Sequence, residues 1–91
     1  MEYLFLKRTG NSYKYCITNN LENIFTIPLK EYHFSIEDFS LSNKTINTKK
    51  EMEKLVKATR EIIERSIEEN DILFTFDENN NLINTQILNP K

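Results

Sequence analysis

The segment from residue 48 to residue 67 is the feature that most constrains the fold. Thr48-Lys49-Lys50-Glu51 fits a capping box, with Thr48 as the N-cap and Glu51 as the third helical residue. Mostly apolar side chains then recur at helical spacing, at Met52, Leu55, Val56, Thr59, Ile62, Ile63 and Ile67. Asn70 suits the left-handed position that follows a helix. The pattern predicts one long amphipathic helix, whose apolar stripe has to cover another element.

Two strands joined at Gly10-Asn11 are predicted in the stretch EYLFLKRTGNSYKYCIT. Glycine at the first central position suits a type II′ turn, and a two-residue loop sets the pairing register. One face then carries Leu4, Leu6, Arg8, Tyr13, Tyr15 and Ile17, and the other carries Tyr3, Phe5, Lys7, Lys14, Cys16 and Thr18. We expect Asn19-Asn20 to turn the chain into a third strand over residues 23–27, which Pro28 ends.

The remaining segments complete a sheet. Residues 30–34 predict a strand, and the possible capping box Ser35-Ile36-Glu37-Asp38 favours a turn or a single helical turn after it. Residues 71–88 predict a hairpin with its loop at Asn79-Asn80, which pairs Phe76 with Ile83, Phe74 with Thr85 and Ile72 with Ile87. The chain is therefore predicted to be a single α+β domain over residues 1–91. Its mostly antiparallel sheet has about five strands, with one long helix on one face and a ββββ-α-ββ-like order.

Composition limits the compartment and the partners that we expect. The 91 residues carry a formal charge of −2, which gives no overall attraction to nucleic acid or to anionic lipid. The start Met-Glu-Tyr lacks a signal-peptide pattern, and the longest apolar stretch, at residues 24–29, is too short to span a membrane. Cys16 is the only cysteine, which rules out an internal disulfide and a zinc site built from paired cysteines. We expect a cytoplasmic protein, and the abundant asparagine indicates an AT-rich bacterial or phage genome.

Groups suited to catalysis are few. His33, the only histidine, shares a strand face with Glu31, and Glu37 could add a third metal ligand only if the chain bends suitably. A mid-strand thiol such as that of Cys16 is usually an inert small apolar group. A glycine-rich phosphate loop is excluded because Gly10 is the only glycine. We therefore predict no catalytic, metal-binding or cofactor-binding residues, and a protein that is not an enzyme.

The charge on the helix departs from the local rule. Lys49 and Lys50 lie in its first turn, and Glu68 and Glu69 lie at its last, opposite to the signs that the helix dipole favours. A solvated face with ion pairs at Glu53–Lys57 and Glu61–Arg65 accounts for this without a function. The functional interpretation is that the basic end meets a phosphate or an acidic partner, through Lys44, Thr48, Lys49, Lys50, Lys54 and Lys57.

The second face of the sheet is the other candidate surface, because one helix covers only one side. It carries Tyr3, Phe5, Lys7, Lys14 and Cys16, a combination of aromatic and basic residues that is common at protein interfaces. We predict that this face contacts another protein or a second copy of the chain. The alternative is that the loop over residues 28–46 folds across the face and buries it.

These surfaces lead to three functional hypotheses. The first is a small non-catalytic binding protein that acts through protein–protein contacts as an inhibitor or adaptor, for example an anti-defence protein encoded by a phage or another mobile element. The second is a binder of nucleotide or nucleic acid at the basic end of the helix. The third is a small enzyme of an unrecognised kind, which would lose its activity on the substitution His33→Ala.

Overall fold

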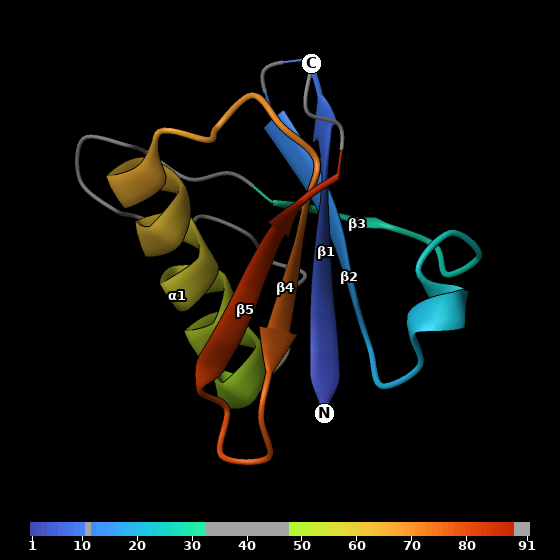
Figure 1. The fold of residues 1–91 in the computed structure, drawn as a ribbon. Helices are drawn as coiled ribbons and strands as arrows, with labels where there is room; N and C mark the ends of the chain where they lie inside the picture. Colours follow the sequence, from blue (N-terminus) through green and yellow to red (C-terminus); the bar gives the residue numbers. More distant parts are fainter. Residues whose placement is uncertain (11, 33–47, 89–91) are drawn as a thin grey trace.

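The computed structural model describes residues 1–10, 12–32 and 48–88. The elements in chain order are β1 (Glu2–Thr9), β2 (Ser12–Thr18), the 3-10 helix η1 (Leu21–Asn23), β3 (Lys30–Tyr32), α1 (Lys49–Arg65), β4 (Ile72–Phe76) and β5 (Leu82–Ile87). The strands form one antiparallel sheet in the order β3-β2-β1-β4-β5, in which β3 is a three-residue edge strand. Helix α1 packs on one face of this sheet (Figure 1), which confirms the predicted α+β fold.

The first hairpin has the predicted register. Leu4 pairs with Ile17 and Phe5 with Cys16, so both predicted sets of facing residues are confirmed. Gly10 has a φ of 61°, a left-handed conformation that suits glycine at the first central position of this turn.

The main core lies between α1 and the sheet. Its fully buried members are Leu4, Leu6, Tyr13, Tyr15, Leu55, Ala58, Ile62, Ile72, Phe74 and Phe76. The helical stripe is rotated slightly from the predicted one. Lys54 and Ala58 are buried within it, whereas Met52, Val56 and Ile63 are only half-buried.

Helix α1 begins as predicted and ends earlier than predicted. The Thr48 hydroxyl accepts a hydrogen bond from the backbone N–H of Glu51 at 3.1 Å. At the other end Ser66, and not Asn70, takes the left-handed conformation, with a φ of 53°. The N–H groups of Ser66 and Ile67 donate to the carbonyls of Ile63 and Ile62, which is a Schellman motif. The prediction for Asn70 was therefore wrong.

The predicted strand over residues 23–27 is not formed. Asn20 instead caps η1, because its side-chain oxygen accepts a hydrogen bond from the N–H of Glu22 at 3.1 Å. Turns follow as far as Thr26, and a bend lies at Ile27. Three described strands thus precede α1, and not the four of the predicted order. Strand β3 lies within the predicted strand over residues 30–34, and the predicted turn after it lies outside the described residues.

The last hairpin has the predicted pairs Ile72–Ile87 and Phe74–Thr85, but not Phe76–Ile83. A register shift after Thr75 pairs Phe76 with Leu82 instead. Such a bulge places one extra residue on one strand, and here it leaves the side chain of Ile83 49 % exposed.

Candidate functional site

The second face of the sheet carries a small core of its own. Phe5, Cys16, Ile24 and Leu73 are buried there. Ile27 and Leu29 pack against them, so the segment between η1 and β3 covers part of this face. This segment does not cover the whole face, and some of its own side chains face the solvent.

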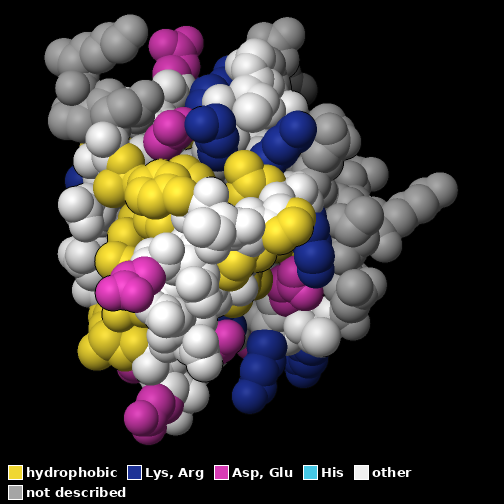
Figure 2. Space-filling view, turned by 90° about the vertical axis from the view of Figure 1, so that its right-hand side faces the viewer, with side chains coloured by type: hydrophobic (Ala, Val, Ile, Leu, Met, Phe, Trp, Pro, Cys, Tyr) yellow, Lys and Arg dark blue, Asp and Glu magenta, His cyan; other side chains and the backbone are white. Residues whose placement is uncertain are grey.

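Phe25 is the most exposed large apolar side chain of the described residues, at 80 %. Its ring stands edge-on to that of Phe5, with the ring centroids 5.8 Å apart. Leu21 nearby in the chain is 42 % exposed. The apolar surface formed by Phe25 with the partly buried Tyr3, Ile27 and Leu29 is called the Phe25 patch below. Figure 2 shows hydrophobic side chains gathered on this side of the molecule, with both basic and acidic side chains at their border.

The five residues predicted for a protein interface take different positions on this face. Phe5 and Cys16 are buried, Tyr3 and Lys14 are half-buried, and Lys7 is exposed. Sequence reasoning thus identified the face but missed its outermost residue, Phe25. The signal that could have found it is Asn20, since a cap at this position predicts a helical turn in place of a strand.

Cys16 is not placed as a nucleophile. Its sulfur lies 3.9 Å from the carbonyl oxygen of Ile24, and burial raises the pKa of the thiol. A buried, protonated thiol reacts slowly, because the thiolate is the reactive form.

The basic end of α1 is partly occupied by internal contacts. Lys54 is only 3 % exposed, and its ammonium lies 3.0 Å from Glu2 Oε1 and 5.6 Å from the ring centroid of Phe76. The ammonium of Lys30 lies 3.4 Å from Glu51 Oε1. Of the six residues predicted to contact an anion, Thr48, Lys49 and Lys50 are exposed and Lys44 lies outside the described residues.

The β4–β5 turn docks against the same part of α1. Lys57 Nζ donates to the carbonyl oxygen of Asn80 at 2.6 Å, and Asn80 Nδ2 donates to the Lys50 carbonyl at 3.3 Å and to Glu53 Oε2 at 3.2 Å. Lys57 therefore contacts this turn. The ion pair of Glu61 and Arg65 is present at 3.7 Å, as predicted.

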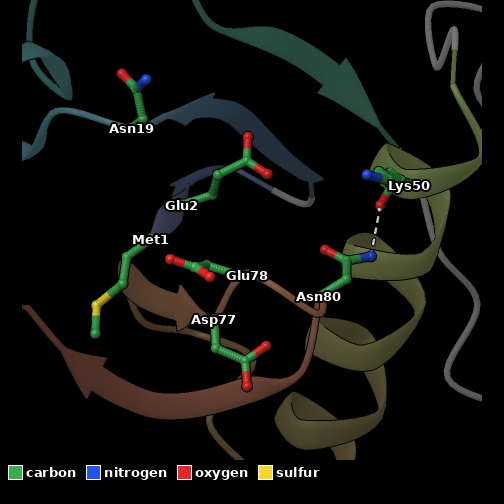
Figure 3. A pocket seen from close by; sticks show the side chains of 7 residues that line it. All are labelled: Met1, Glu2, Asn19, Lys50, Asp77, Glu78 and Asn80. Carbon is green, nitrogen blue, oxygen red and sulfur yellow. Dashed lines mark hydrogen bonds between the residues drawn. The ribbon is translucent and has the colours of Figure 1, made fainter.

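A pocket of about 330 Å³ lies beside this turn (Figure 3). It is lined by Met1, Glu2, Asn19, Lys50, Asp77, Glu78 and Asn80. Two of its three carboxylates are engaged elsewhere. Glu2 pairs with Lys54, and Asp77 accepts hydrogen bonds from the N–H groups of Asn79 and Asn81, both at 2.9 Å. These backbone bonds lower the pKa of Asp77 and fix the turn.

Within the described ranges, no three histidine, cysteine, aspartate or glutamate side chains lie close enough together to hold a metal ion. His33 and Glu37 lie outside those ranges, and of Glu31 only the backbone is described. No helix among the described residues is long and apolar enough to cross a membrane. Comparison with family models, with curated proteins and with solved structures finds no match for this chain.

Proposed function

We propose that this protein is a small non-catalytic binding protein that acts through the Phe25 patch on another protein. The exposed ring of Phe25 carries the proposal, since its 80 % exposure is unusual for a side chain of this size. Its ring also contacts the ring of Phe5 edge-on, which joins it to the buried residues of this face. An inhibitor or an adaptor acts by binding another protein through such a surface. The asparagine-rich composition favours a phage-encoded protein, for example an anti-defence inhibitor.

The chemistry of the surface indicates the kind of partner. A phenylalanine side chain buries roughly 200 Å² when it is fully covered, and four-fifths of that area at about 25 cal/mol per Å² corresponds to about 4 kcal/mol as an upper bound. A partner that covers the ring would therefore draw a large part of its binding energy from Phe25. Lys7 and Lys14 lie on the same face of the sheet, so a partner with an apolar pocket and acidic residues at its rim would fit.

Binding of a nucleotide or nucleic acid at the basic end of α1 is the second candidate. The exposed side chains of Lys49 and Lys50 favour it. We rank this function second because two lysine side chains near this end already have carboxylate partners. Lys30 pairs with Glu51, and Lys54 pairs with Glu2.

The test is quantitative affinity capture from host lysate with three baits: the wild type, Phe25→Ser and Phe25→Tyr. Phe25→Ser removes the exposed ring, and Phe25→Tyr keeps the ring and its contact with Phe5. We expect a protein that is enriched on the wild-type and Phe25→Tyr baits and lost from Phe25→Ser. Proteins captured equally by all three baits would contradict the proposal.

A further inference from the structure

The two edges of the sheet differ in how they are protected. Strand β3 forms one edge, and it has only three residues, two of them charged. Strand β5 forms the other edge, with six residues of sequence LINTQI, which contains neither a charge nor a proline. Short length, charge, proline and bulges are the usual devices that keep a sheet edge from pairing. The bulge of β5 lies at Ile83, and the regular part that follows, residues 84–87, has neither a charge nor a proline and therefore the composition of an edge that pairs.

The hydrogen bonds show which backbone groups of β5 face outward. Asp71 and Leu88 continue the pairing register of β4 and β5 by one residue. The N–H of Leu88 donates to the carbonyl of Asp71 at 2.9 Å, so the two form a hydrogen-bonded pair. Because hydrogen-bonded and non-hydrogen-bonded pairs alternate in an antiparallel ladder, Gln86 and Asn84 also point their backbone groups toward β4. The N–H and C=O groups of Thr85 and Ile87 therefore point away from the sheet.

Helix α1 borders this edge. A pocket of about 300 Å³ lies between the helix and the strand, lined by Glu61, Arg65, Leu82, Ile83, Asn84 and Thr85. The side chains of Glu61 and Arg65 are 29 % and 45 % exposed. A strand that adds to β5 would thus lie beside one negative and one positive side chain.

We propose that β5 pairs antiparallel with β5 of a second copy of the chain, about a two-fold axis at Thr85. In this register Thr85 lies opposite Thr85 of the second copy and exchanges two backbone hydrogen bonds with it. Asn84 lies opposite Gln86 of the second copy, and both side chains are exposed and able to hydrogen-bond as amides. The two-fold axis makes each of these pairings occur twice, so the surface is complementary to itself. This surface is separate from the Phe25 patch.

Sedimentation equilibrium over a wide concentration range tests the pairing. The wild type is expected to double its mass as the concentration rises. The double substitution Asn84→Lys and Gln86→Lys places like charges opposite each other twice, and it should raise the dissociation constant roughly tenfold or more. The matched variant, Asn84→Lys with Gln86→Glu, places opposite charges there instead and should keep the dimer.

Thr85→Pro provides a second route, because it removes an outward N–H and leaves the bonds to β4 intact. It is expected to stay monomeric, and circular dichroism checks that it folds. A wild type that is monomeric at every concentration would overturn the proposal and would leave the β5 edge to an extended segment of a different protein. Equal dimerisation of the two charge variants would show that Asn84 does not lie opposite Gln86 of the second copy, and would overturn the proposed register. Capture through the Phe25 patch is expected to survive in all of these variants, so the two proposals fail separately.

Discussion

The ion pair between the buried ammonium of Lys54 in α1 and Glu2 in β1 allows a test of how a charge between the helix and the sheet affects stability. Lys54 is 3 % exposed, whereas its partner Glu2 is 49 % exposed, with 3.0 Å between the charged atoms. Breaking a fully buried ion pair by removing one partner costs about 3–5 kcal/mol, and an exposed pair contributes about 0–1 kcal/mol. For this half-exposed pair we expect Glu2→Gln to lower the free energy of unfolding by about 1–3 kcal/mol.

The substitution Lys54→Met should behave differently. It removes the ammonium together with the cost of burying it, and it keeps an unbranched side chain against the ring of Phe76. We expect the free energy of unfolding to change by less than about 1 kcal/mol. Glu2→Gln should then have little effect in the Lys54→Met background, because no buried charge is left without a partner.

Urea denaturation followed by far-ultraviolet circular dichroism measures these differences in a double-mutant cycle. A loss of 1 kcal/mol corresponds to a fall of about 4–8 °C in melting temperature for a domain of this size. Two results would refute the reasoning: Glu2→Gln without effect on stability, or Lys54→Met as destabilising as Glu2→Gln and additive with it. Either would mean that Glu2 does not compensate a buried charge on Lys54.

Three further predictions concern the core, the thiol and the last turn. Leu55→Ala, at a fully buried position of α1, should lower the free energy of unfolding by about 2–5 kcal/mol, as measured by the same denaturation. Cys16 should react with a thiol reagent such as a maleimide far more slowly in the folded than in the unfolded protein, and equal rates would contradict its burial. The folded-state pKa of Asp77 is lowered, so its contribution to stability is present above its unfolded-state pKa and is lost as the pH falls through the folded-state pKa. Asp77→Asn should therefore destabilise the protein at neutral pH and flatten the acid side of its stability profile.

The elements that were predicted correctly are those in which local chemistry and long-range packing agree. Gly10 at the turn and the alternation on both sides of it specify one register, and the observed pairs follow it. At Thr48 the capping box matches the start of the apolar stripe, and the helix begins there. The α+β fold follows from these two features and the last hairpin.

The errors lie where two local interpretations competed. Residues 23–27 are rich in the β-branched and aromatic side chains typical of a strand, but the Asn20 cap starts a 3-10 helix at Leu21, and the turns after it bring Ile24 and Ile27 over Phe5 and Cys16. Ser66 ended the helix in place of Asn70 because Ile67 could then turn back onto the core beside Ile62. These outcomes depend on tertiary contacts, which no local pattern contains.

The candidate site was predictable only in part for the same reason. The sequence identified the face that carries Tyr3 and Phe5, since the register determines it. It could not show that Phe25 would be left in solvent, because that depends on the path of the chain over the sheet. Nor could it show that the ammonium of Lys54 is buried against Phe76.

Site-specific photo-crosslinking tests the central claim, that the Phe25 patch binds another protein, most directly. A photoreactive phenylalanine analogue is placed at Phe25 in one protein and at Arg60, an exposed residue of α1 on the opposite side of the sheet, in a control. We expect illumination in host lysate to join a distinct protein to the chain labelled at position 25 and not to the control. No adduct at position 25, or the same adducts at both positions, would contradict the claim.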